Sequence, residues 1–197
     1  TNATGIMPNN DYDRYNFSFR NTTNFLNNKF ILDTSANYII QNDKNMVSQG
    51  QYFNPLTSLY LFPRGEDFSD VAVYERYDDL SGVNTQYWPY GDLGGVSSQN
   101  PYWIMNRMNR ENDRRRYKLA ASLQYNIIEG LNVQGRVSID NTESKYTEKF
   151  HAGTVGNFAG PKGRYKEENR LDRQVYADVL ANFNKTFNEF NVTANLG

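Results

Sequence analysis

The sequence predicts an all-β protein, an antiparallel up-and-down meander, from two observations. Residues 116–127 alternate between apolar and polar side chains, and residues 131–140 repeat this alternation after Glu129 and Gly130. Because successive side chains of a strand point to opposite faces, the two segments predict a hairpin with one apolar and one polar face. Each strand spans about a dozen residues, roughly twice the usual 5–6, and a strand that crosses a bilayer needs about 9–11. The strand length therefore favours a sheet that spans a membrane.

The same alternation recurs along the chain and predicts six strands in three hairpins. The predicted strands are 13–25, 29–41, 115–128, 131–142, 171–184 and 189–197. Residues 1–11 are expected to form a loop, and so are the long segments 42–114 and 143–170, where no period is sustained. Within the longer of these, residues 71–74 fit either a short helix or a short strand. Short turns at one rim and long loops at the other are typical of outer-membrane barrels, and six strands are too few to close one. We therefore expect a segment of a larger barrel wall.

The composition limits which binding partners and which kinds of catalytic or metal site the chain can have. The chain has 197 residues, a formal net charge of -1 and no cysteine. The small net charge gives no support for nucleic-acid binding, and the missing thiols exclude disulfides, thiolate metal sites and cysteine nucleophiles. A mean hydropathy of -0.79 still fits a transmembrane sheet, because its apolar positions alternate with polar ones. We expect no cofactor, no metal and no nucleic-acid partner.

The polar faces of the predicted strands carry charged residues that would line a barrel lumen or contact a plug. These candidate lumen-facing residues are Arg14, Arg20, Arg116, Lys118, Arg136, Asp172 and Asp178. Their apolar neighbours, at every second position, would face lipid. Phe25 and Phe30 lie beside a predicted turn, with Tyr15 and Tyr38 at the far end, where aromatic belts would meet the membrane interfaces.

The loop at 42–114 contains the candidate residues for binding a ligand or a partner. They are Tyr87, Trp88, Tyr90, Tyr102, Trp103 and Arg64. Exposed rings offer flat apolar faces to a sugar or to a protein. The interpretation that we favour is that these rings pack the loop on itself, because a large ordered loop needs a core of its own. Arg64 lies between Pro63 and Gly65, which are first of all turn signals.

Two further features give weaker signals. The basic run Arg110, Arg114, Arg115 and Arg116 would suit acidic lipopolysaccharide at an outer rim, although a solvated run paired with its own carboxylates is favoured. His151 is the only histidine of the chain. No serine or aspartate frames it as a catalytic triad, so we expect a surface histidine and no enzymatic activity.

Three motifs in and after the long loop carry a family resemblance. They are Asn54-Pro-Leu-Thr-Ser-Leu-Tyr-Leu-Phe-Pro-Arg-Gly65, Asn100-Pro-Tyr-Trp103 and Asn112-Asp-Arg-Arg-Arg-Tyr117. In this order they resemble the SusC/RagA family, TonB-dependent transporters of the outer membrane of Bacteroidetes, and the resemblance spans residues 12–196. It implies a 22-stranded barrel plugged by an N-terminal domain. It also implies uptake of glycans, oligosaccharides or peptides with a SusD-like surface lipoprotein, and coupling to TonB through regions that this chain lacks. The expected location is the bacterial outer membrane, with its lipid as a further partner.

A soluble all-β module for carbohydrate binding or adhesion is the alternative. Such a sandwich would present Trp88 and Trp103 to its ligand. Sandwich strands usually run about 5–6 residues, with turns every 8–12. The predicted strands are about twice as long, which favours the membrane sheet.

Overall fold

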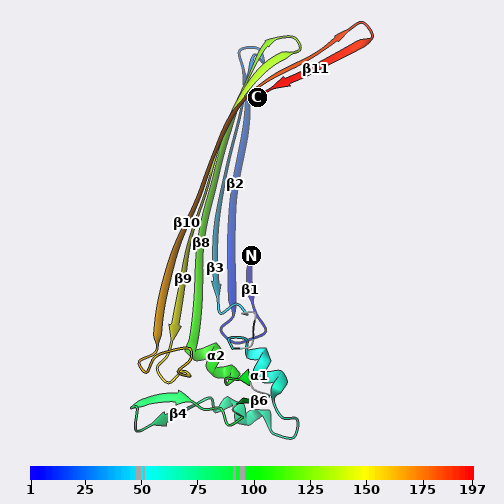
Figure 1. The fold of residues 1–197 in the computed structure, drawn as a ribbon. Helices are drawn as coiled ribbons and strands as arrows, with labels where there is room; N and C mark the ends of the chain where they lie inside the picture. The colour runs from blue at the N-terminus through cyan, green and yellow to red at the C-terminus, as the bar shows by residue number, and fades with distance from the viewer. Residues whose placement is uncertain (48–49, 51, 91, 94–95) are drawn as a thin grey trace. The chain divides into compact units, whose positions relative to one another are not determined.

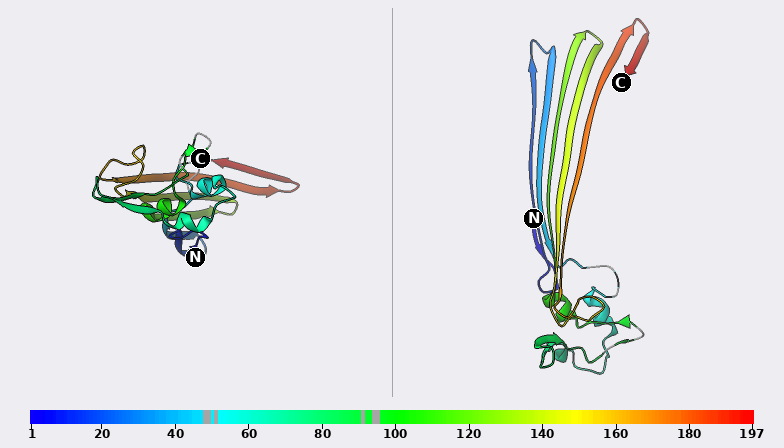
Figure 2. Two further views of the ribbon diagram at one scale, coloured as in Figure 1. Left: turned by 90° about the horizontal axis from the view of Figure 1, so that it is seen from below. Right: turned by 60° about the vertical axis from the view of Figure 1, so that its left-hand side comes forward.

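A seven-stranded sheet dominates the fold. The computed structural model describes residues 1–47, 50, 52–90, 92–93 and 96–197. In these residues the sheet has the strand order β1-β2-β3-β8-β9-β10-β11, and neighbouring strands run antiparallel (Figures 1 and 2). Because strands that follow one another within the sheet are also neighbours in it, the topology is an up-and-down meander. The predicted fold class is confirmed.

The strands of this sheet are longer than the alternation predicted in five of the six predicted cases, whereas the last, Phe190–Leu196, is shorter than the predicted 189–197. Their bounds are β1 (Asn2–Thr4), β2 (Asp11–Phe25), β3 (Phe30–Lys44), β8 (Met108–Ile128), β9 (Leu131–Phe150), β10 (Arg164–Phe187) and β11 (Phe190–Leu196). The strand β10 has 24 residues, and β8 has 21. The short strand β1 pairs with β2, with Ala3 opposite Tyr12. The expectation of a continuous loop over residues 1–11 was therefore wrong.

The loop expected at 143–170 was also wrong, because β9 continues to Phe150 and β10 begins at Arg164. The missed part of β9 has polar side chains on both faces, so it shows no apolar alternation. Ion pairs between neighbouring strands stabilise it instead. Lys145 pairs with Glu167 at 3.1 Å, and Arg164 pairs with Glu148 at 3.1 Å. Opposite charges on neighbouring strands support a sheet, and hydropathy does not register them.

The segment between β3 and β8 contains several short elements instead of one featureless loop. These are α1 (Pro55–Leu61), the 3-10 helix η1 (Phe68–Ala72), α2 (Pro101–Arg107), and the two-stranded pairs β4 (Glu75–Asp78) with β5 (Val83–Gln86) and β6 (Asp92–Leu93) with β7 (Val96–Ser97). Of residues 71–74, left open between helix and strand, Val71 and Ala72 end η1, and Val73 and Tyr74 belong to neither a helix nor a strand. The predicted turn after Phe62 is present, because the Glu66 N–H donates to the Pro63 carbonyl at 3.2 Å.

The chain divides into two compact units. The loop unit consists of Thr1–Arg14, Gln41–Asp113 and Ser144–Asn169, and the sheet unit consists of Tyr15–Ile40, Arg114–Glu143 and Arg170–Gly197. A buried cluster forms the core of the loop unit. It contains Trp103, Ile104, Met108, Phe150 and Ala159, with Phe53, Tyr74 and Phe158 packed against it.

Three short turns join the strands of the sheet unit at one of its ends. The Asn126 N–H donates to the Lys29 carbonyl at 2.8 Å, and the Asn184 N–H donates to the Gly130 carbonyl at 2.7 Å, so neighbouring hairpins meet at their turns. Gly130 has a φ of 85°, and a Cβ there would lie 2.5 Å from the Asn184 carbonyl oxygen. Only glycine combines this left-handed conformation with so close an approach.

Candidate functional site

The sheet unit presents an apolar face that no second layer covers within the described residues. Leu119, Leu123, Val137 and Val179 are 46%, 43%, 46% and 64% exposed. They occupy the alternating positions that predicted one continuous face. Soluble proteins rarely leave a contiguous apolar surface of this kind uncovered, and such surfaces mark contacts with lipid or with a protein.

Contacts between strands confirm that the predicted polar side chains share the opposite face. Guanidinium–carboxylate pairs join neighbouring strands at Arg20–Asp33, Arg116–Asp140 and Arg136–Asp178. Amide contacts follow the same parity, with Asn37 donating to Asn16 at 2.8 Å and Asn182 donating to Asn132 at 3.0 Å. Each of these contacts links two predicted polar positions, so the two-face division of the sheet is a property of the structure.

The other candidate lumen-facing residues are also exposed. Lys118, Asp33, Arg136 and Tyr176 line a hollow of about 300 Å³, together with the small residues Ala120, Ser122 and Ser138. Asp172 pairs with Arg170 of its own strand at 2.8 Å. Arg14 belongs to the loop unit, where its backbone hydrogen-bonds to Thr1.

Aromatic rings stack on the apolar face beside the short turns. The rings of Phe25 and Phe30 lie 5.3 Å apart, and the ring of Tyr125 stacks on Phe30 at 4.6 Å. The predicted pair Phe25 and Phe30 thus gains a third ring from β8. The rings lie beside the turn where an interfacial aromatic belt was predicted, and that role stays a prediction.

Trp103 is a core residue, so its assignment as a ligand-binding candidate was wrong. Its side chain is 0% exposed and packs with Met108 and Phe150. Its indole N–H donates to the Thr154 hydroxyl at 3.2 Å, which satisfies the one polar atom of the ring. The favoured interpretation, in which loop rings pack the loop on itself, is correct for this residue.

The remaining candidate rings are partly buried and form a chain of edge and tilted contacts. Trp88 meets Tyr90 at 5.2 Å, and Tyr90 meets Phe62 at 5.0 Å. Trp88 also donates its indole N–H to Ser98 at 2.8 Å. Burial raises the pKa of the Tyr90 phenol. Aromatic pairs of this geometry stabilise packing beyond their buried area.

Tyr87 and Tyr102 are held by other contacts of the loop unit. The guanidinium carbon of Arg76 lies 3.4 Å from the centre of the Tyr87 ring, a cation–π contact. Tyr102 lines an apolar hollow of about 160 Å³ with Leu56, Leu59, Phe68 and Met105. Arg64 is exposed beside the turn that follows Phe62.

Two of the three family-like motifs begin helices. Asn54 caps α1 by accepting from the Leu56 N–H, and Asn100 caps α2 by accepting from the Tyr102 N–H at 2.9 Å. In both helices proline follows the cap, where its missing N–H costs no hydrogen bond. Asn100 is fully buried, and its amide also donates to the Val71 and Tyr87 carbonyls at 2.9 and 3.1 Å. The Asn-Pro pairs are a sequence signal for these caps that an apolar–polar alternation does not contain.

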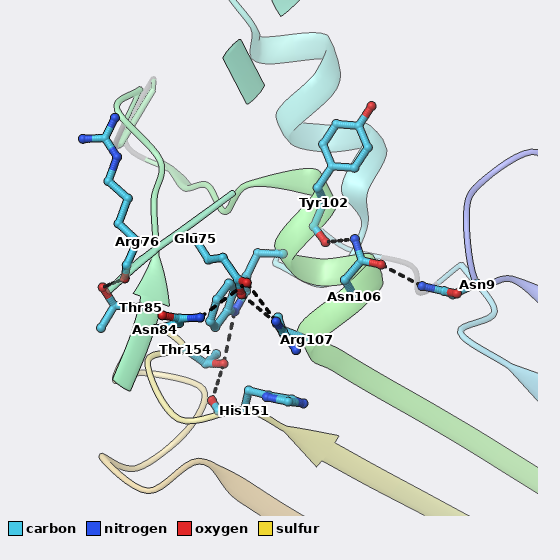
Figure 3. A network of polar contacts seen from close by, with 11 residues as sticks. Asn9, Glu75, Arg76, Asn84, Thr85, Tyr102, Asn106, Arg107, His151 and Thr154 are labelled. Atoms are coloured by element: carbon cyan, nitrogen blue, oxygen red, sulfur yellow. Dashed lines mark hydrogen bonds and ion pairs between the residues drawn. The ribbon is translucent and has the colours of Figure 1, made fainter. Parts of the chain in front are cut away.

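An ion pair that no sequence pattern predicted joins β4 to the end of α2 (Figure 3). Arg107 donates to both carboxylate oxygens of Glu75, at 2.8 and 2.9 Å. Both side chains are less than one-third exposed. The hydrogen bond from Arg107 lowers the pKa of Glu75, and the same bond raises the pKa of Arg107. The pair therefore holds the β4–β5 hairpin against α2 while Glu75 is ionised.

We expect acid to loosen this hairpin through Glu75. Because the folded pKa lies below the ordinary value of 4.5, the stabilisation is complete well above pH 4.5 and is lost as the pH falls through the lowered pKa. In Glu75→Gln, the amides of β4 and β5 will exchange hydrogen faster than in the wild type at pH 7. The difference will shrink toward pH 3. Asp78, whose pKa is also lowered, titrates in both proteins and cancels in the comparison. A difference independent of pH would contradict the role of this carboxylate.

The arginines of the basic run and the single histidine make different contacts. Arg116 pairs with Asp140 on the polar face, as the favoured interpretation predicted. Arg110 is partly buried, and its guanidinium donates to the Phe53 carbonyl at 3.3 Å. His151 is exposed, and its carbonyl accepts from the Thr154 hydroxyl at 2.7 Å (Figure 3). Among the described residues, no group of three or more histidine or acidic side chains is placed to hold a metal ion.

No protein-family model matches the chain, and no curated protein matches it. Among the described residues, no helix is both long and apolar enough to cross a membrane.

Proposed function

We propose that the sheet unit is part of the wall of a transmembrane β-barrel. The observation that carries the proposal is the exposed row of Leu119, Leu123, Val137 and Val179 opposite a face on which guanidinium–carboxylate pairs join neighbouring strands. In such walls, apolar residues that face the lipid outside alternate with polar residues that face the water inside. Five strands, β2, β3, β8, β9 and β10, have 15 to 24 residues and exceed the 9–11 residues or so that a bilayer crossing needs. The apolar face would contact lipid, and the charged face would line the lumen or contact a plug.

The particular protein that we propose is an outer-membrane importer of the SusC/RagA type, dependent on TonB. The order of the three motifs supports this assignment, and so does the contrast between short turns and long connections. The cargo would be glycans, oligosaccharides or peptides, and the partner a SusD-like surface lipoprotein. In this proposal the chain supplies wall and loops, and coupling to TonB takes place elsewhere. The sheet forms part of the wall and carries out no chemical step in this proposal, and we propose no catalytic residue.

The soluble binding module is the weaker candidate. It would need the apolar row of the sheet to lie in a dry interior between two layers. That row is exposed instead, and Trp103, one of the two rings proposed for its ligand, is buried.

A pair of cysteine variants tests the proposed orientation. The chain has no cysteine of its own, so Leu123→Cys and Ser122→Cys each place one thiol at neighbouring positions on opposite faces of β8. After coupling to an environment-sensitive fluorophore and reconstitution into vesicles, we expect apolar-environment emission and quenching by brominated lipid at position 123. At position 122 we expect quenching by aqueous iodide. Aqueous quenching of both labels would show that the apolar face does not contact lipid.

A further inference from the structure

A hollow on the polar face of the sheet unit crosses four neighbouring strands, β3, β8, β9 and β10. Its volume is about 300 Å³, which lies at the lower end of the roughly 300–1,000 Å³ that ligand sites occupy. Side chains of two lengths line it. The short ones are Ala120, Ser122 and Ser138, and the long ones are Asp33, Lys118, Arg136 and Tyr176. Because side chains stand roughly perpendicular to a sheet, the short residues leave space between their longer neighbours.

Lys118 brings an unpaired positive charge to this hollow. Within the described part of the chain, its ammonium makes neither an ion pair nor a hydrogen bond. Its charge also acts on Asp140, but Arg116 already donates to both oxygens of that carboxylate, at 2.8 and 2.6 Å. The donors of Lys118 are therefore free to bind an anionic ligand.

The charges of the polar face sum to a positive value. Away from the turns, the polar positions of the sheet unit carry six cations and four carboxylates, which leaves two positive charges. Each of the four carboxylates is already paired with an arginine. The cations are Arg20, Arg114, Arg116, Lys118, Arg136 and Arg170, and the carboxylates are Asp33, Asp140, Asp172 and Asp178. The excess of positive charge favours an anion at the hollow that Lys118 lines.

One carboxylate oxygen in the hollow is left without a donor. The hydrogen bonds that Asp33 accepts all end at its Oδ2, from Nε and Nη2 of Arg20 at 3.2 and 3.1 Å and from the Thr22 hydroxyl at 2.7 Å. Among the residues that the structure describes, none donates to Oδ1. A simple anion offers no donor for this oxygen, so a ligand that fits the hollow needs donors in addition to its negative charge.

The remaining groups of the lining suit a ligand that carries hydroxyls. Arg136 donates to Asp178 from Nε and Nη2, which leaves its Nη1 for a ligand. The hydroxyls of Ser122 and Ser138 have no partner within the described residues. A hydroxyl both donates and accepts, so the two serines match other hydroxyls. Tyr176 is 48% exposed, and its ring offers an apolar surface to C–H groups.

We infer that this hollow binds a hexuronate, one sugar-acid residue of an acidic oligosaccharide. Lys118 and Nη1 of Arg136 hold its carboxylate through charge-assisted hydrogen bonds. Asp33 and the two serines bind its hydroxyls, and the ring of Tyr176 packs against the C–H groups of the sugar. The role of this site in uptake rests on the proposed function, because the inference narrows the cargo from oligosaccharides in general to acidic ones.

The first measurement compares the binding of trigalacturonate with that of the neutral galactose trimer of the same linkage, by calorimetry on the protein in detergent micelles. We expect trigalacturonate to bind about tenfold tighter, through its charge-assisted hydrogen bonds. Lys118→Gln should remove this advantage and leave the affinity for the neutral trimer unchanged, whereas Lys118→Arg should keep most of it. Arg170→Gln is the matched control and should leave both affinities unchanged, because Arg170 is a cation of the same face that pairs with Asp172 outside the hollow.

The second measurement locates the ligand on the sheet. Since the chain has no cysteine, Ser122→Cys places a single thiol of similar size in the hollow, and Gln124→Cys places one on the same face of β8 outside it. At a concentration about ten times its Kd, trigalacturonate should slow the reaction of the thiol at position 122 with iodoacetamide about tenfold, by mass action. The thiol at position 124 should react at the same rate with and without the ligand.

Three results would each overturn the inference: equal affinity for the acidic and the neutral trimer, an equal loss in Arg170→Gln and Lys118→Gln, or equal protection at positions 122 and 124. Tighter binding of hexaglutamate than of trigalacturonate would also overturn it, because the hollow would then favour an acidic peptide. The label at position 123 separates this site from the barrel proposal. Absent protection at 122 with a lipid-quenched label at 123 rejects the site alone, whereas protection at 122 with an aqueous label at 123 rejects the barrel and keeps the site.

Discussion

Val137→Arg will destabilise the sheet in a bilayer by about 2–4 kcal/mol, whereas Ser138→Arg will cost much less. Val137 is 46% exposed on the apolar face of β9, near the middle of the strand's course through the sheet unit. A guanidinium there must leave water for hydrocarbon or pull water and headgroups toward it. Ser138 lies on the opposite face and lines the hollow with Lys118 and Arg136, where water solvates an added charge.

The measurement is reversible unfolding by guanidinium chloride in the presence of vesicles, compared among the wild type and both variants. Val137→Ala serves as the control for lost side-chain volume, and we expect a small effect because an exposed side chain leaves no cavity. Equal costs for arginine at positions 137 and 138 would contradict the assignment of faces. A larger cost at 138 would reverse it.

The strands of the sheet could be predicted from the sequence wherever apolar side chains on one face alternate with polar side chains on the other. In β8 the apolar residues Leu119, Leu123 and Ile127 stand at odd positions, and Arg116, Lys118 and Gln124 stand at even ones. This period of two depends only on strand geometry, so it needs no knowledge of neighbouring strands. The sequence placed Arg116 on the polar face, and the structure adds its pairing with Asp140 across the hairpin.

The prediction of strands failed where ion pairs with neighbouring strands stabilise the strand and no apolar alternation is present. The end of β9 carries Lys145 and Lys149, which bind Glu167 and Glu111 of other strands. An ion pair joins residues far apart in the sequence, so a local pattern cannot contain it. The link between Arg107 and Glu75 escaped prediction for the same reason, since 32 residues separate its partners.

Trp103 was included among the ligand-binding candidates because composition does not distinguish a buried ring from an exposed one. Tryptophan among glycine and proline suits a ligand platform and a loop core equally well. The deciding facts are the packing of Trp103 on Met108 and Phe150, and the hydroxyl of Thr154 at its indole nitrogen. Asn100 offered a usable signal, because Asn before Pro is a known helix start. Recognising α2 would have predicted a helix whose first turn carries both Tyr102 and Trp103.

Trp103→Ala will cost about 3–5 kcal/mol of local stability in the loop unit, the range for a fully buried large side chain. The substitution opens a cavity in the cluster of Ile104, Met108 and Phe150 and leaves Thr154 without its indole donor. We expect amide hydrogen exchange to quicken in α2 and in residues 151–163, while the amides of β8–β9 near Gly130 keep their protection. The amides of the sheet unit should keep their protection because contacts between its own strands hold them, independently of the Trp103 cluster.

Two further variants distinguish a core role of Trp103 from a ligand-binding role. Trp103→Phe keeps most of the volume and loses only the hydrogen bond to Thr154, so it should cost about 1–2 kcal/mol. Tyr60→Ala removes a ring that is 85% exposed and should change stability by less than about 0.5 kcal/mol. If Trp103→Ala proved no more destabilising than Tyr60→Ala but abolished glycan or peptide binding, Trp103 would be a binding residue. A graded loss of protection from Tyr60→Ala through Trp103→Phe to Trp103→Ala follows only from a ring that holds the loop unit together.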